Sequence, residues 1–74
     1  MQIAQFNEMA RAGGINSVVV LSGKSGYSIQ VETGDSIEPV RTARGHVRVF
    51  TAWSTIKSKL DIAGVTEFMV ISKA

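Results

Sequence analysis

The spacing of apolar residues changes twice along this chain, and the changes separate two helical segments from a stretch of strands. Residues 3–12 place apolar side chains three and four positions apart, the period of one helical face. Residues 18–50 instead contain β-branched runs and alternation with a period of two. Helical spacing then returns, with Trp53, Ile56 and Leu60 on one face. These changes predict the order of the elements.

Four strands are predicted between the two helices. Residues 18–22 form a β-branched run typical of a strand buried on both faces, and residues 27–32 alternate as a half-exposed partner. Two further strands, residues 37–43 and 47–50, flank an Arg-Gly pair. Because Pro39 cannot donate a ladder hydrogen bond, we expect its strand to lie at a sheet edge.

The second helix has a predicted beginning and end. The Thr51 hydroxyl is a suitable N-cap, because it can accept a hydrogen bond from a free N–H of the first turn. Gly64 stops the helix, and residues 67–72 form a last strand. We expect this strand to pair beside residues 18–21, the most apolar run.

Together these elements predict a single α+β domain over residues 1–74, since this length suits one domain and not two. We expect a mostly antiparallel sheet of about five strands, in the order α-β-β-β-β-α-β, covered on one face by two helices. The predicted core comprises Ile3, Phe6, Val20, Ile29, Val31, Val40, Val49, Trp53, Ile56, Leu60, Phe68 and Val70.

Composition excludes several classes of function. The chain has no cysteine, which removes disulfides, thiolate metal sites and a cysteine nucleophile. His46 is the only histidine, and no metal site, cofactor or catalytic residue is predicted around it. No apolar run is long enough to cross a bilayer and the N-terminus does not resemble a secretion signal, so we expect a cytoplasmic protein. A small core without disulfides favours a homodimer.

Three arginines, Arg41, Arg44 and Arg48, lie within eight positions, although the net charge is only +2. A two-residue turn at Arg44-Gly45, or a four-residue loop, would gather the valines on one face and place Arg41 opposite Arg48. A three-residue loop ending in a left-handed Gly45 is good turn chemistry, but it would mix apolar and polar faces. The hydrophobic pattern therefore favours the two-residue turn.

Two arginines directly across from one another require an anion nearby. Glu32 or Glu38 could supply that charge on a neighbouring strand. A nucleic-acid phosphate could also supply it, because the arginine fork matches phosphate oxygens. Most charge clusters are solvated faces, so the residues alone favour the glutamates.

The segment from residue 43 to residue 71 combines an Arg-Gly turn, an Arg-Val-Phe strand, a short helix and a Gly-Val step into a final strand. This pattern resembles a family of very small proteins of plasmids and integrative elements, usually named as replication- or partition-associated. Thr-Ala-Trp-Ser at 51–54 departs from the leucine and acid expected there. The resemblance implies mobile-element maintenance and no particular chemistry. The matching positions are Arg44-Gly45, Arg48-Val49-Phe50, Ile56, Leu60, Gly64-Val65 and Phe68.

Two functions from different classes follow. The first is a non-enzymatic accessory protein of plasmid replication or maintenance that contacts DNA, or a DNA-bound protein, through Arg41, Arg44 and Arg48. The alternative is a small protein–protein interaction module, an adaptor or inhibitor, that docks by strand addition or through an edge helix without binding nucleic acid. No enzyme activity, small-molecule substrate or membrane partner is predicted, because no acid–base pair or nucleophile constellation is visible.

Overall fold

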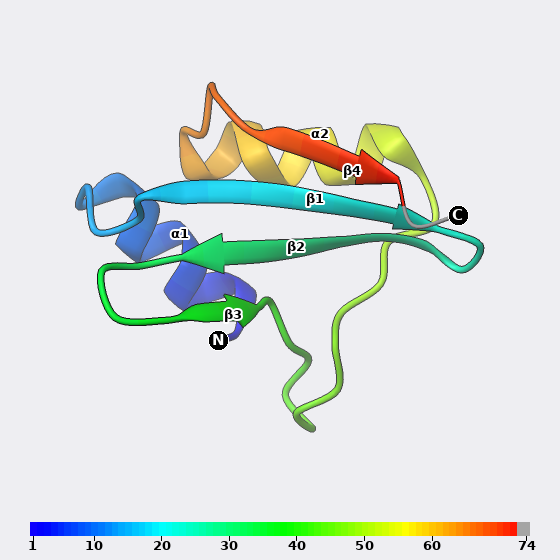
Figure 1. Ribbon diagram of the computed structural model, residues 1–74, viewed down its shortest axis with the longest axis horizontal. Coiled ribbons are helices and arrows are strands. Elements are labelled where there is room, and N and C mark those ends of the chain that lie inside the picture. Colours follow the sequence, from blue (N-terminus) through cyan, green and yellow to red (C-terminus); the bar gives the residue numbers. More distant parts are fainter. Residues whose placement is uncertain (73–74) are drawn as a thin grey trace.

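The computed structural model describes residues 1–72 of the 74-residue chain and shows an α+β domain, which confirms the predicted class (Figure 1). These residues form two helices and four strands. In chain order they are α1 (Ile3–Arg11), β1 (Ser17–Gly23), β2 (Gly26–Glu32), β3 (Ile37–Pro39), α2 (Trp53–Ala63) and β4 (Met69–Ser72).

The four strands form one mixed sheet in the order β3-β2-β1-β4. Successive strands β1, β2 and β3 pair antiparallel, whereas β4 joins β1 in parallel, with Val19 paired to Met69 and Val20 to Val70. The prediction that the last strand lies beside the valine run is therefore confirmed. The sheet has two outer strands, β3 at one edge and β4 at the other (Figure 1).

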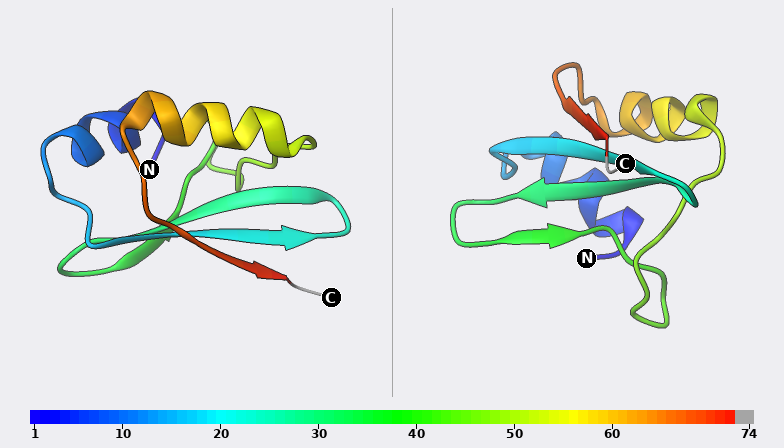
Figure 2. Two further views of the ribbon diagram at one scale, coloured as in Figure 1. Left: turned by 90° about the horizontal axis from the view of Figure 1, so that it is seen from above. Right: turned by 45° about the vertical axis from the view of Figure 1, so that its right-hand side comes forward.

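Both helices lie on the same face of the sheet (Figure 2, left). The register of the central hairpin explains this arrangement, because it pairs Val18 with Val31 and Val20 with Ile29, so all four side chains point toward the helices. These residues are buried, and removing each from water contributes about 1.5–3 kcal/mol. The remaining buried residues are Phe6, Val40, Phe50, Ile56, Leu60 and Ala63.

For three residues the prediction that they belong to the core is wrong. Val49, Trp53 and Val70 are 49%, 39% and 48% exposed, respectively. Val70 lies on the outer strand β4, and Val49 lies outside the sheet altogether. Trp53 instead makes aromatic contacts at the edge of the core, with ring centroids 5.6 Å from Tyr27 and 6.1 Å from Phe68.

Two local predictions about the segment before α2 also need correction. The N-cap of this helix is Ala52, without a side-chain hydrogen bond, so Thr51 stands one residue too early to cap it. The predicted strand at 47–50 is not a strand, and β3 ends at Pro39 rather than continuing to residue 43. The ladder keeps one further hydrogen bond beyond Pro39, from the Val40 N–H to the Ile29 carbonyl at 2.9 Å, but the Val40 carbonyl accepts from the Arg48 N–H and no longer pairs with β2. At the other end of α2, Gly64 adopts the left-handed conformation expected of a helix stop (φ 78°).

Gly26 and Phe50 hold the segment before α2 against the start of β2. The backbone N–H of Tyr27 donates to the Phe50 carbonyl, and the N–H of Phe50 donates to the Tyr27 carbonyl, both at 2.7 Å. Gly26 has a φ of 129°, and a Cβ there would overlap the Phe50 carbonyl oxygen. Only glycine tolerates both the positive φ and the close approach of the Phe50 carbonyl.

Replacing Gly26 with alanine should therefore lower the free energy of unfolding by about 2 kcal/mol or more, through strain at positive φ and the overlap with Phe50. The midpoint of thermal unfolding should fall by about 10 °C, followed by circular dichroism. Gly34→Ala is the matched control, because position 34 has no strained φ and open space around it. Equal stability of the two variants would contradict the close approach.

Candidate nucleic-acid interface

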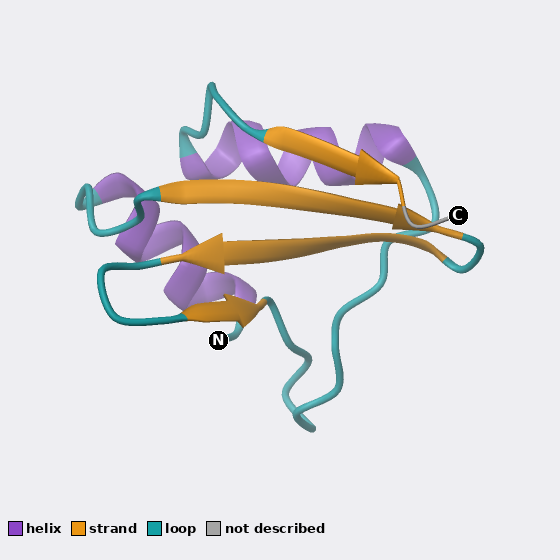
Figure 3. Cartoon of the chain, viewed as in Figure 1, coloured by secondary structure: helices purple, strands orange, loops and turns teal. Residues whose placement is uncertain are grey.

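The three predicted site residues lie on one segment, residues 40–50, which we call the arginine loop. It extends away from the sheet between β3 and α2 (Figure 3). Two isolated bridges fix it to the rest of the protein, Gln2 with Arg41 and Tyr27 with Phe50, and a third, Arg41 with Val47, lies within the loop. The loop is thus attached to β2 and to the residues just before α1, while its turn projects from the body of the protein (Figure 2, right).

The turn at the tip is a three-residue loop, so the predicted two-residue turn is wrong. The N–H of Thr42 donates to the His46 carbonyl at 2.7 Å, and the N–H of Gly45 donates to the Thr42 carbonyl at 3.0 Å. Gly45 has a φ of 89°, whereas Arg44 keeps a negative φ. Gly45 adopts this conformation without steric cost, and segregating the two faces would bury little here, because Val47 lies outside the sheet and is 43% exposed.

The three arginines consequently have three different environments. Arg41 lies opposite Val47 and not opposite Arg48, and its Nη1 donates to the Gly45 carbonyl at 2.8 Å. The Arg48 guanidinium lies 5.4 Å from the centre of the Phe50 ring, a cation–π distance. Arg44 is exposed at the turn. Two guanidiniums are thus held in place by the loop itself.

The two glutamates considered as partners for these arginines bind elsewhere. Glu38 accepts from the Met1 amino group, 3.5 Å away, and Glu32 accepts from the Ser17 hydroxyl at 3.1 Å. Within residues 1–72, the ion pairs are Met1–Glu38 and Lys57–Asp61, so none involves the arginine loop. The interpretation that a glutamate neutralises Arg41 or Arg48 therefore has no support from these contacts.

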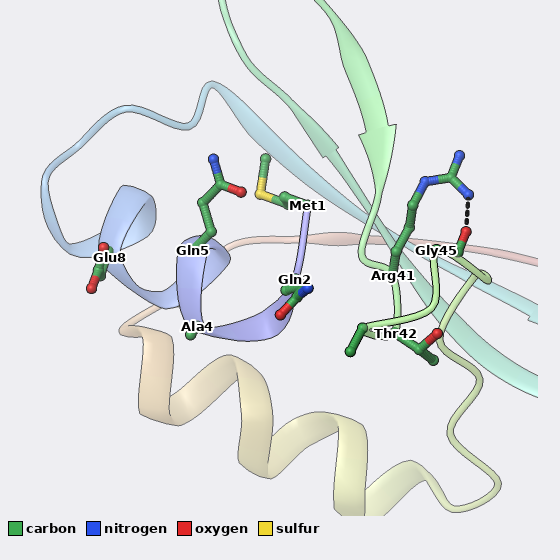
Figure 4. A pocket seen from close by; sticks show the side chains of 9 residues that line it. Met1, Gln2, Ala4, Gln5, Glu8, Arg41, Thr42 and Gly45 are labelled. Atoms are coloured by element: carbon green, nitrogen blue, oxygen red, sulfur yellow. Dashed lines mark hydrogen bonds between the residues drawn. The ribbon is translucent and has the colours of Figure 1, made fainter.

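A pocket of about 500 Å³ is lined by residues of the arginine loop and of the first turns of α1 (Figure 4). Gln2, the N-cap of α1, makes no side-chain cap, so the first N–H groups of this helix lack a side-chain acceptor there. The helix N-terminus and Arg41 favour an anion in this region, whereas Glu8 opposes it. The pocket is lined by Met1, Gln2, Ala4, Gln5, Glu8, Arg41, Thr42, Ala43 and Gly45.

The contribution of α1 to this region was not predicted from the sequence. The N–H of Arg41 donates to the Met1 carbonyl at 2.6 Å, a contact between residues 40 positions apart. No periodicity or motif indicates such a pairing. His46 is exposed, and the described residues contain no group of three His, Asp or Glu side chains that could hold a metal ion.

None of the helices in residues 1–72 is long and apolar enough to span a membrane. Comparison of the chain with protein-family models, with curated proteins and with solved structures gives no match. The resemblance to small plasmid-borne proteins therefore stays a prediction.

Replacing Arg44 with glycine distinguishes the observed turn from the two-residue alternative. In the three-residue loop Arg44 has a negative φ, so glycine only adds freedom to the unfolded chain and should lower the free energy of unfolding by about 0.5–1 kcal/mol. A two-residue turn of type I′ needs a positive φ at Arg44, and glycine would then stabilise the protein. Urea unfolding measures the sign, with Arg44→Ala as the control that removes the same side chain.

Proposed function

We propose that this protein is a non-enzymatic accessory protein of plasmid or mobile-element maintenance that contacts DNA, or a DNA-bound protein, in the cytoplasm through its arginine loop. The observation that carries the proposal is the placement of Arg41, Arg44 and Arg48 on a projecting loop without an ion-pair partner in residues 1–72. The role in mobile-element maintenance rests on the sequence resemblance alone.

The loop's own contacts support phosphate binding by these side chains. A guanidinium has five N–H donors, and the hydrogen bond to Gly45 uses one donor of Arg41. Stacking on Phe50 uses the face of Arg48 and leaves its edge for an acceptor. Because both side chains are already held, binding phosphate would cost them less conformational entropy than it would cost free arginines.

The expected binding is electrostatic and insensitive to base sequence. Three phosphate contacts predict a salt dependence with a slope of about −2.7 in log K against log salt. Raising the salt from about 50 to about 200 mM should then weaken binding about 40-fold. Contacts of this type position a protein on DNA without reading its sequence.

A second candidate function is a small protein–protein interaction module, and the observation that favours it is the uncovered outer strand β4. Met69, Val70 and Ile71 are three consecutive apolar residues that are 60%, 48% and 43% exposed. Exposed apolar runs of this length are typical of binding surfaces. A protein–protein interaction module requires no positively charged surface. A measurement of DNA binding therefore distinguishes the two candidate functions.

The double variant Arg41→Ala/Arg48→Ala tests the first candidate by fluorescence anisotropy of a labelled duplex of about 25 base pairs. Removing two phosphate contacts should reduce the salt slope by about 1.8 and abolish binding near physiological salt. Lys57→Ala/Lys59→Ala is the matched control, because it removes the same charge from α2, away from the loop (Figure 2, right). Wild type that does not bind at low salt, or equal losses in both variants, would contradict direct contact with DNA through the arginine loop.

A further inference from the structure

The two outer strands of the sheet differ in how they are protected from pairing with another strand. The β3 edge is short, contains Pro39 and Glu38, and receives hydrogen bonds from the Met1 amino group at both residues. Proline, charge and covering contacts are the usual devices that block an edge. The β4 edge, Met69–Ser72, has no proline and no charged residue. Of the two edges, β4 is therefore the one open to an added strand.

The apolar side chains of β4 lie on both faces of the sheet. Met69 and Ile71 pair with Val19 and Leu21 of β1, so these four share the face that the helices leave uncovered. Val70 pairs with Val20 and so lies on the helix face, where it remains half exposed because no strand lies beyond it. A strand placed against β4 would cover apolar side chains on both faces.

We propose that this strand is β4 of a second copy of the chain, paired antiparallel about a two-fold axis at Val70. With this axis perpendicular to the sheet, the helices of both copies lie on the same side. Met69 of each copy then lies opposite Ile71 of the other copy. Every position in this register meets an uncharged residue, which is the complementarity that a neutral edge requires. The apolar stripe of Val19, Leu21, Met69 and Ile71 then continues across the axis into its copy.

The proposed dimer does not depend on the arginine loop. In Figure 1 the loop lies on the β3 side of the sheet and β4 forms the opposite edge. Substitutions in β4 therefore leave Arg41, Arg44 and Arg48 in place. A protein that does not bind DNA would therefore not contradict the proposed dimer, and a monomeric protein would not contradict the proposed binding of DNA.

Sedimentation equilibrium over a wide range of protein concentration tests the proposal with a matched pair of substitutions. Met69→Lys places a charge within the proposed interface and should weaken dimerisation on the order of 100-fold. Ile37→Lys is the control, because Ile37 lies on the same face of the opposite edge strand and is 61% exposed, against 60% for Met69. Fluorescence of Trp53, whose ring lies against Phe68, reports whether β4 still docks in each variant.

A cysteine at the axis provides a direct second test, because the chain contains no cysteine of its own. Opposite residues of an antiparallel pair have Cα atoms about 4.5–5.5 Å apart, within the reach of a disulfide. Val70→Cys should therefore form a disulfide-linked dimer under mild oxidation, whereas Ile37→Cys, which lies away from the axis, should form no disulfide-linked dimer. A wild-type protein that is monomeric at all concentrations, or a dimer weakened by Ile37→Lys and not by Met69→Lys, would overturn the proposal.

Discussion

The pairing of β1 with β2 is the constraint on which the rest of the structure depends. Its register places Val18 and Val20 beside Val31 and Ile29 on one face of the sheet. A shift by one residue would turn all four side chains away from the helices and leave Phe6 of α1 and Leu60 of α2 without a surface to cover. The hairpin therefore determines which face becomes the core. Because β1 and β2 pair with each other at the centre, β3 and β4 become the two edge strands.

The elements that follow a regular hydrophobic period could be predicted from the sequence. The two helices, the central hairpin and the position of the last strand beside β1 all rest on spacing alone, and the structure agrees with them. Prediction failed where an element has little burial to define it. Val49 and Val70 look like core residues by type, but one lies outside the sheet and the other on an outer strand. Composition does not reveal which strand is outermost.

The arginine loop shows a second limit of sequence reasoning. The three arginines could be placed on one segment from the sequence. The length of the turn was predicted wrongly, because the prediction assumed that apolar and polar side chains would separate onto opposite faces. Segregation stabilises a strand only when one of its faces is buried, and most of this segment is exposed. Gly45 therefore determined the geometry. The contact between Arg41 and Met1 joins distant parts of the chain, and nothing local to either residue indicates it.

The parallel position of β4 has a consequence for how the protein folds. Val19 and its partner Met69 are 50 positions apart in the sequence, and the pairing of β1 with β2 joins residues much closer together. Closing the larger loop costs more entropy, so the hairpin should form first and β4 should dock late. Until it docks, the apolar edge of β1 is itself unpaired. A nascent or partly unfolded chain therefore exposes a longer aggregation-prone strand than the native protein does.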